Sequence, residues 1–137
     1  MRAGTCRIAL YSGAATGLGH MRRNLLIGQT IACTSLQANV LMIAESHLAG
    51  AFPMVPGMDC LALPGLRRRP DGELVPLHLG ISSQDLITLR ASAICGALEA
   101  FEPDVLFVDF SPRGGRGELE PALEYLHARG RAQLRVR

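Results

Sequence analysis

Residues 7–24 read RIALYSGAATGLGHMRRN, an apolar run followed by a glycine-rich turn and the polar start of a helix. The apolar run at 7–11 is short and shows little alternation, as in a strand covered on both faces. Glycine has no Cβ and tolerates positive φ, so Gly13, Gly17 and Gly19 favour a tight turn that a ligand can approach closely. The first N–H groups of the following helix favour an anion. The stretch therefore predicts an α/β domain with a phosphate-binding turn.

Strand and helix signals alternate along the rest of the chain. Apolar runs predict further strands at 39–44, 59–63 and 104–109. Helices are expected at about 20–33, from Ser82 to the stop at Pro103, and at about 120–129. Ser82 with Asp85 resembles a capping box, and Gly130 follows the last helix. This alternation predicts an open, mostly parallel Rossmann-like sheet with helices on both faces.

The length of 137 residues predicts one domain, residues 1–137. Residues 64–80 interrupt the strand and helix pattern, and their turn signal at 70–72 predicts a surface excursion. The tail at 131–137 resembles the opening of another strand, so we expect the domain to be truncated.

Composition narrows the class of protein. The net charge of +2 argues against a nucleic-acid partner, and the longest apolar runs fall far short of the ~18 residues that span a bilayer. The N-terminus shows no secretory signal, which predicts a cytoplasmic protein. The four cysteines are widely spaced, so we expect buried free thiols and neither a disulfide framework nor a metal site. No cofactor is expected.

His20 and Asp109 are the candidate catalytic residues. His20 sits at the predicted start of the first helix and is able to exchange a proton near neutral pH. A histidine base needs a partner that orients its ring. Asp109 ends a buried strand, and ligand sites of open α/β sheets lie at such ends. Two alternatives stay open: His20 as an ordinary polar residue, and Asp109 as a cap of the turn near Ser111.

The predicted substrate-binding residues surround His20: Gly17, Gly19, Arg22, Arg23 and Asn24. A cation in the first turn of a helix costs roughly 0.3–1 kcal/mol, which an anionic ligand would relieve. The alternative for the two arginines is a solvated surface pair. Counted from Gly17, Arg22 occupies the third glycine position of G-x-G-x-x-G, where it would obstruct close helix–strand packing. That departure argues against a dinucleotide site.

Two further groups of polar residues are weaker candidates, one at the edge where the strands end and one in the excursion at 64–80. Glu45 and His47 follow the second strand and are additional candidates at the edge where the strands end. The arginines at 67–69 are either a solvated loop or an electropositive rim for an acidic acceptor or a membrane headgroup.

The motif GLGHMRRNLL at 17–26, placed after a first strand, resembles the first glycine loop of GT-B glycosyltransferases. Within that class, the motif is similar to those of predicted bacterial glycosyltransferases. These are related to the enzyme that adds N-acetylglucosamine to lipid-linked muramyl-pentapeptide. The segments that continue this pattern are 51–53, 56–59, 63–64, 108–109 and 116–119. The resemblance spans most of the chain.

The resemblance implies a function. GT-B enzymes place two Rossmann-like domains across a cleft, the N-terminal one holding the acceptor and the C-terminal one the nucleotide-sugar. This chain resembles part of the N-terminal domain, so it is expected to transfer a sugar to an acceptor hydroxyl only when a donor-binding domain or subunit completes it. His20 would be the base or a phosphate contact, and Asp109 would orient it. Such enzymes usually need no bound metal.

Two other functions stay open. One is a non-catalytic partner subunit of a two-chain glycosyltransferase. The other is an unrelated nucleotide-binding α/β domain. Nucleotide binding by this chain alone would favour the latter. Peripheral contact with a membrane is compatible with the acceptor-side assignment.

Overall fold

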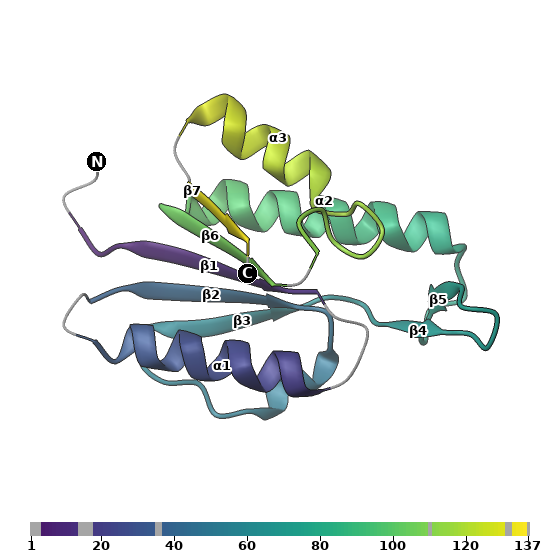
Figure 1. Ribbon diagram of the computed structural model, residues 1–137, viewed down its shortest axis with the longest axis horizontal. Helices are drawn as coiled ribbons and strands as arrows, with labels where there is room; N and C mark the ends of the chain where they lie inside the picture. Colours follow the sequence, from purple (N-terminus) through teal and green to yellow (C-terminus); the bar gives the residue numbers. More distant parts are fainter. Residues whose placement is uncertain (1–3, 14–17, 35–36, 110, 131–132, 137) are drawn as a thin grey trace.

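The computed structural model describes residues 4–13, 18–34, 37–109, 111–130 and 133–136. Five parallel strands form one sheet in the order β3-β2-β1-β6-β7 (Figure 1). The strands are β1 (Arg7–Ser12), β2 (Asn39–Ala44), β3 (Met58–Ala62), β6 (Val105–Asp109) and β7 (Gln133–Val136). The helices are α1 (Leu18–Ala32), the short 3₁₀ helix η1 (His47–Ala51), α2 (Ser83–Phe101) and α3 (Glu120–Arg129).

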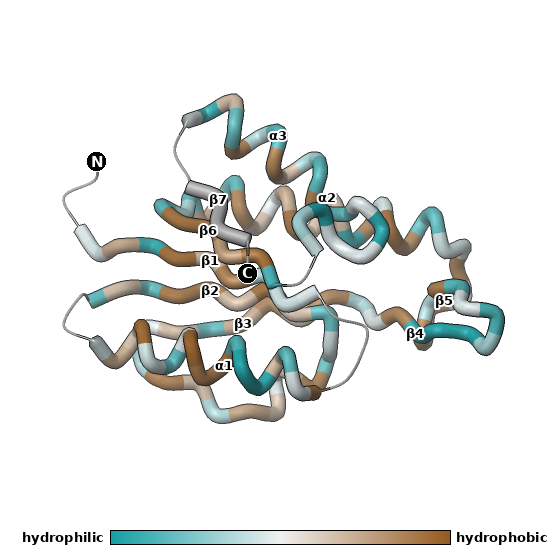
Figure 2. Tube along the Cα trace, viewed as in Figure 1, coloured by the Kyte–Doolittle hydropathy of each residue, from teal (hydrophilic) through white to brown (hydrophobic). Residues whose placement is uncertain are grey.

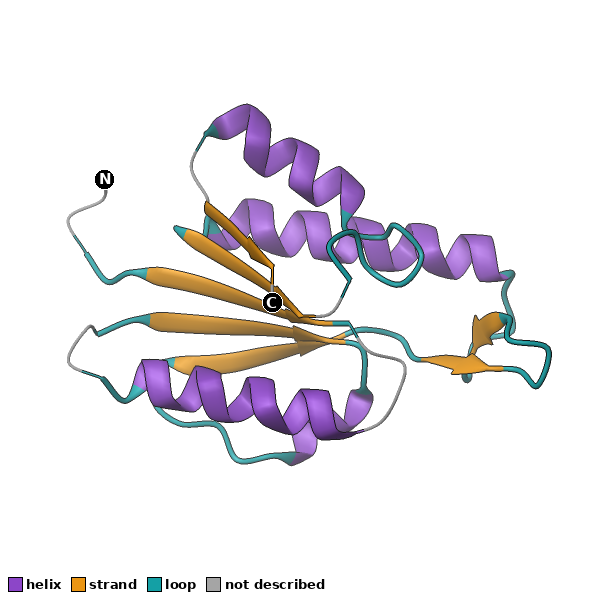
Figure 3. Cartoon of the chain, in the orientation of Figure 1, coloured by secondary structure: helices purple, strands orange, loops and turns teal. Residues whose placement is uncertain are grey.

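Helices cover both faces of the sheet, α1 on one side and α2 with α3 on the other (Figure 3). Alternate residues of β1, β2, β3 and β6 therefore enter opposite cores. The core beside α1 includes Ile8, Leu10, Met21 and Leu25. The core beside α2 and α3 includes Ala9, Tyr11, Ile94 and Leu98. Burial on both sides explains why the strands lack polar alternation, and the predicted α/β architecture is confirmed.

The chain changes direction across the sheet at β1. From β1 it passes through α1 to β2 and β3, and it then returns to the other side of β1 to form β6. The carboxyl ends of β1 and β6 therefore flank a topological switch point, the place where ligands bind in open α/β sheets.

Local signals set the helix ends where the sequence predicts them. The Ser82 hydroxyl accepts a 3.0 Å hydrogen bond from the backbone N–H of Asp85 at the start of α2. Helix α3 starts at Glu120 with Pro121 in its first turn and is followed by Gly130, whose φ is 60°. These contacts satisfy backbone groups that a helix leaves unpaired at its ends.

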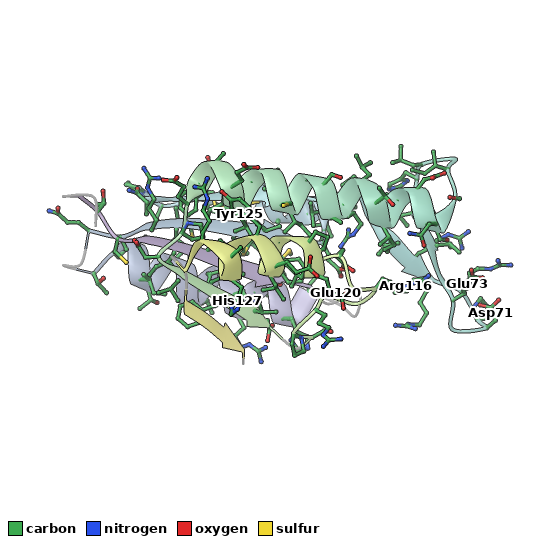
Figure 4. All side chains as sticks on the ribbon, turned by 90° about the horizontal axis from the view of Figure 1, so that it is seen from above. Asp71, Glu73, Arg116, Glu120, Tyr125 and His127 are labelled. Carbon is green, nitrogen blue, oxygen red and sulfur yellow. The ribbon has the colours of Figure 1, made fainter. Side chains whose placement is uncertain are left out.

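The segment at 64–80, which the sequence predicts as a surface excursion, contains regular structure. It contains an antiparallel hairpin of β4 (Leu66–Arg68) and β5 (Leu74–Pro76), which projects beyond the carboxyl edge of the sheet (Figure 1). Its tip is hydrophilic, and Asp71 and Glu73 lie there (Figures 2 and 4). Strands of three residues are too short to give a periodic signal. Within the tail, residues 133–136 form β7, which pairs with β6.

Close packing between α1 and the sheet depends on Gly28, a residue that the sequence pattern did not single out. A Cβ there would lie 2.6 Å from the Met58 Cε and 3.2 Å from the Leu10 Cδ1. Arg22 was expected to obstruct this packing, but it is exposed and lies away from the sheet. That expectation was wrong because Met21, Asn24, Leu25 and Gly28 form the buried face of α1.

The expectation of buried thiols is also corrected. All four cysteines are free, but Cys33 is exposed and Cys6, Cys60 and Cys95 are half-buried. Within the described ranges, no helix is long and apolar enough to cross a membrane.

Candidate functional site

Three side chains of α1 converge on the carboxylate of Asp109. Asn24 donates from Nδ2 to Oδ2 at 3.0 Å. Arg23 donates from Nη2 to Oδ1 at 2.7 Å and to Oδ2 at 2.8 Å. The Nδ1 of His20 lies 3.2 Å from Oδ2. The structure thus brings the two predicted catalytic residues together, with two of the predicted substrate-binding residues between them.

The fold explains this convergence. Residues 20, 23 and 24 share one face of α1 because positions three and four apart are neighbours on a helix. Asp109 is the last residue of β6 and lies beside Ser12 of β1 in the strand register. Val108 enters the core beside α2, so alternation directs Asp109 to the opposite face, where α1 lies.

Asp109 is buried, with 6% of its surface exposed, yet its surroundings favour the ionised form. Burial alone raises the pKa of the carboxyl. Hydrogen bonds from Asn24, Arg23 and His20, together with the charge of Arg23, outweigh burial and hold the pKa below its usual value. A carboxylate that stays ionised is able to orient a histidine and to stabilise its protonated form.

Among the described residues, the Asp109 side chain makes no contact that would cap the following turn, its alternative role. Ser111 N–H donates to the backbone carbonyl of Asp109 at 3.0 Å, and the carboxylate itself contacts α1.

The remaining predicted substrate-binding residues differ in position. Gly17 lies outside the described residues. Gly19 is the second residue of α1, not part of the turn, and a Cβ there would meet nothing within 4 Å. Gly13 allows a close approach of the Tyr11 ring, which a Cβ would overlap. Neither Gly13 nor Gly19 has a positive φ. Arg22 is exposed, whereas Asn24 is buried and supports Asp109.

A second polar cluster, missed by sequence reasoning apart from Glu45, lies on the opposite face of the same edge. Arg90 of α2 is fully buried and donates from Nη2 to Glu45 Oε1 at 2.7 Å and to Glu118 Oε1 at 3.4 Å. Its Nη1 donates to the Pro64 carbonyl at 2.6 Å. Tyr11 donates to Glu118 Oε1 at 2.9 Å. The cluster ties β1, β2, α2 and the segment before α3 together.

Burial dominates the electrostatics of this cluster. It raises the pKa of Glu45, against the charge of Arg90, and the charge of Glu118 and its hydrogen bond raise that pKa further. Burial and Glu118 also raise the pKa of Tyr11, which stays protonated. The sequence contained one indication of this buried cluster. Leu86, Arg90 and Ile94 follow helical spacing, so Arg90 lies within the apolar stripe of α2.

Two hollows flank the carboxyl edge. One, of about 310 Å³, lies between the ends of β1 and β2, η1 and the hairpin, and its walls include Ser12, Glu45 and His47. The other, of about 260 Å³, is on the α1 side and is lined partly by Asn24, Phe107 and Asp109. Among the residues that the structure describes, no three metal-ligating side chains are close enough to hold an ion.

The chain matches no family model, and no curated protein matches it. Among solved structures it is similar to the C-terminal domain of a hydrogenase from Pyrococcus furiosus, with a TM-score of 0.52 and 16% identity. The match covers 96% of this chain and 89% of that domain. At this identity the likeness shows a shared α/β fold, and the Rossmann-like class rests on it together with the strand order.

Proposed function

We propose that this chain forms the acceptor-side part of a GT-B glycosyltransferase, which transfers a sugar from a nucleotide-sugar to an acceptor hydroxyl. One observation carries the proposal: His20 Nδ1 lies 3.2 Å from Asp109 Oδ2 at the switch point of the sheet. A histidine oriented by a buried carboxylate is the usual arrangement of a general base. The resemblance of the loop at 17–26 supplies the reaction class.

In the proposed reaction, His20 accepts the proton of the acceptor hydroxyl while the hydroxyl oxygen attacks the anomeric carbon of the donor sugar. The bond from that carbon to the nucleotide diphosphate breaks, and the diphosphate leaves with the electron pair. Asp109 stabilises the imidazolium that forms. Arg22 is exposed and Arg23 is 45% exposed, so both are accessible to a phosphate group of the substrate.

The proposal requires a donor-binding domain or subunit. The described residues form one Rossmann-like domain, whereas GT-B architecture uses two across a cleft. The alternative of a non-catalytic partner subunit shares this requirement but assigns no base to His20. The alternative of a nucleotide-binding domain assigns the nucleotide to this chain itself.

A binding experiment separates the acceptor-side assignment from nucleotide binding. The chain is titrated with UDP, GDP and ADP, and with inorganic pyrophosphate as the matched probe that lacks a nucleoside. We expect the nucleosides to add less than about threefold to affinity, because the donor would bind to the other domain. A nucleoside diphosphate bound more than about tenfold tighter than pyrophosphate would contradict the proposal, since tenfold corresponds to about 1.4 kcal/mol of recognition of the base or ribose.

A further inference from the structure

The hollow between the ends of β1 and β2, η1 and the hairpin adjoins the site of His20 and Asp109. In the strand register, Ser12 lies between Asp109 on one side and Ala44 on the other. Tyr11 enters the core beside α2, so alternation directs Ser12 to the same face of the sheet as Asp109. Adjacent strands lie about 4.8 Å apart, so the hollow, which Ser12 lines, begins one strand spacing from Asp109. A molecule in the hollow is therefore a neighbour of the proposed base.

The walls of the hollow are mainly aliphatic. They come from the start of α1, from η1, and from the hairpin with the residue after it: Leu18, Met21, Leu48, Leu66 and Leu77. Leu18 and Leu48 are 46% and 41% exposed, so they present apolar surface to solvent. The volume of about 310 Å³ is roughly twice that of a cavity of about 150 Å³ that binds benzene. The hollow therefore has room for an apolar body of about two fused rings.

The charges around the hollow disfavour an ionic ligand. Among the described residues, its walls contain no arginine, so a phosphate or carboxylate group finds no guanidinium there. Glu45 contributes to the wall, but its Oε1 already accepts from Arg90 and its Oε2 is buried. A cation in the hollow would thus lose hydration without reaching a carboxylate oxygen. His47 is exposed, so most of its ring faces water and not the hollow.

The hydroxyl of Ser12 is the polar group of the wall that is best placed to bind a ligand. Ser12 is 4% exposed, and its side chain makes no hydrogen bond to any described residue. A hydroxyl has one hydrogen to donate and two lone pairs that accept, and such groups usually have a partner when they are buried. Ser46 differs, because its hydroxyl oxygen already accepts from the Leu48 N–H at 3.2 Å. An alcohol group in the hollow would give Ser12 the missing partner.

We propose that the hollow binds an uncharged alcohol whose apolar body is about two rings in size, and that this alcohol is the acceptor of the transfer. The rings lie against the aliphatic walls, and the alcohol group exchanges a hydrogen bond with Ser12 beside Asp109. The inference rests on the proposed function for the role of the alcohol as an acceptor, but binding is measured without sugar transfer. An alcohol bound by a chain that transfers no sugar, even with a donor-binding domain supplied, would contradict only the proposed function.

The test uses naphthalene derivatives that differ in one substituent: β-naphthylmethanol, β-methylnaphthalene, β-naphthoate and β-naphthylmethylammonium. Their dissociation constants for the unsubstituted chain are measured by NMR titration. We expect β-naphthylmethanol to bind at least about tenfold more tightly than the anion and the cation, because the walls offer neither charge a partner. Nuclear Overhauser contacts from its rings to the methyl groups of Met21 and Leu48 should place it in the hollow.

Variants of the wall separate the polar contact from the apolar one. Ser12→Ala should weaken β-naphthylmethanol about three- to tenfold and leave β-methylnaphthalene unchanged, since one hydrogen bond has about that effect. Leu48→Gln should weaken both ligands. Leu26→Gln is its matched control, because Leu26 is 64% exposed on α1 and does not line the hollow.

Several results would overturn the inference. These are failure of β-naphthylmethanol to bind, contacts that place it outside the hollow, and a charged analogue that binds as tightly. Equal loss of β-naphthylmethanol and β-methylnaphthalene in Ser12→Ala would refute the hydrogen bond to that hydroxyl. Binding that Leu26→Gln weakens as much as Leu48→Gln would refute the assignment to these walls.

Discussion

Tyr11 and Glu118 are 107 residues apart in the sequence and are joined by a 2.9 Å hydrogen bond inside the core. Both side chains are fully buried. The backbone N–H of Arg116 donates to the other oxygen of Glu118 at 2.8 Å. The bonds to Glu118 fix the loop between β6 and α3 to the end of β1. Because that loop follows Asp109, the last residue of β6, the cluster also stabilises the edge at which the candidate site lies.

Removing the Tyr11 hydroxyl should destabilise the fold. In Tyr11→Phe, Glu118 loses its closest side-chain donor within a buried environment, which costs about 1–3 kcal/mol of unfolding free energy. Tyr125→Phe is a matched control, because the Tyr125 hydroxyl is buried and has no hydrogen-bond partner among the described residues. Urea unfolding of both variants measures the difference. Equal stability of the two would show that the Tyr11 bond contributes nothing.

The neighbouring glycines Gly114 and Gly115 should respond differently to alanine. Gly114 has a φ of 82°, and a Cβ there would lie 2.8 Å from Cδ of Glu118. Gly114→Ala therefore combines a strained backbone with displacement of a buried carboxylate, and about 1–3 kcal/mol of unfolding free energy should be lost. A Cβ at Gly115 meets nothing within 4 Å. Thermal or urea unfolding in which Gly115→Ala is as destabilising as Gly114→Ala would contradict this account.

Glu45 should give the stability a pH dependence that Glu45→Gln removes. Burial, the largest cause, raises the pKa of Glu45 in the folded chain. The folded state then holds the proton more tightly than the unfolded state, so the unfolding free energy falls as pH rises from the usual glutamate pKa to the raised value. Glu45→Gln should flatten this slope while Arg90 keeps Glu118 as its ionic partner.

Unfolding free energies measured from about pH 4 to pH 8 test this sign, since that range begins near the usual pKa of a glutamate. The lowered pKa of Asp109 acts in the other direction: stability is lost as pH falls through that lowered value, below the usual aspartate pKa. Glu99→Gln is the control, because Glu99 is exposed on α2. If the unfolding free energies of Glu45→Gln and of the unsubstituted chain vary with pH in the same way, the raised pKa of Glu45 is refuted.

Much of the fold could be predicted because its signals are local. The range expected for the second strand, 39–44, matches β2, and that expected for the last helix, 120–129, matches α3. Apolar runs, Ser82 as a cap, and Gly130 after α3 are all visible in short windows of sequence. The hairpin strands β4 and β5 could not be predicted from the sequence, because three residues are too few to show a periodic pattern. The register of β7 against β6 depends on contacts that no local window contains.

The two polar clusters also differ in how far the sequence could predict them. Pairing of His20 with Asp109 could be predicted from the rule that carboxyl ends of parallel strands meet at one edge. Arg23 and Asn24 joined them because helix geometry places them on the same face as His20. The partners of Arg90 could not be predicted, since Glu45 lies 45 residues before it and Glu118 lies 28 residues after it. Only the packed fold brings these charges together.

The proposed sugar transfer should depend on His20. With a donor-binding domain or subunit supplied, His20→Ala should lower kcat for sugar transfer on the order of 10²–10⁴-fold, as loss of a general base does. Asp109→Asn should lower kcat in the same direction, because the amide no longer stabilises an imidazolium. If His20 only contacts phosphate, KM rises and kcat is largely kept. Glu99→Gln, on the exposed face of α2, is the control. Steady-state rates that tolerate His20→Ala in both kcat and KM would remove His20 from the site, and efficient transfer by this chain alone would refute the requirement for a second domain.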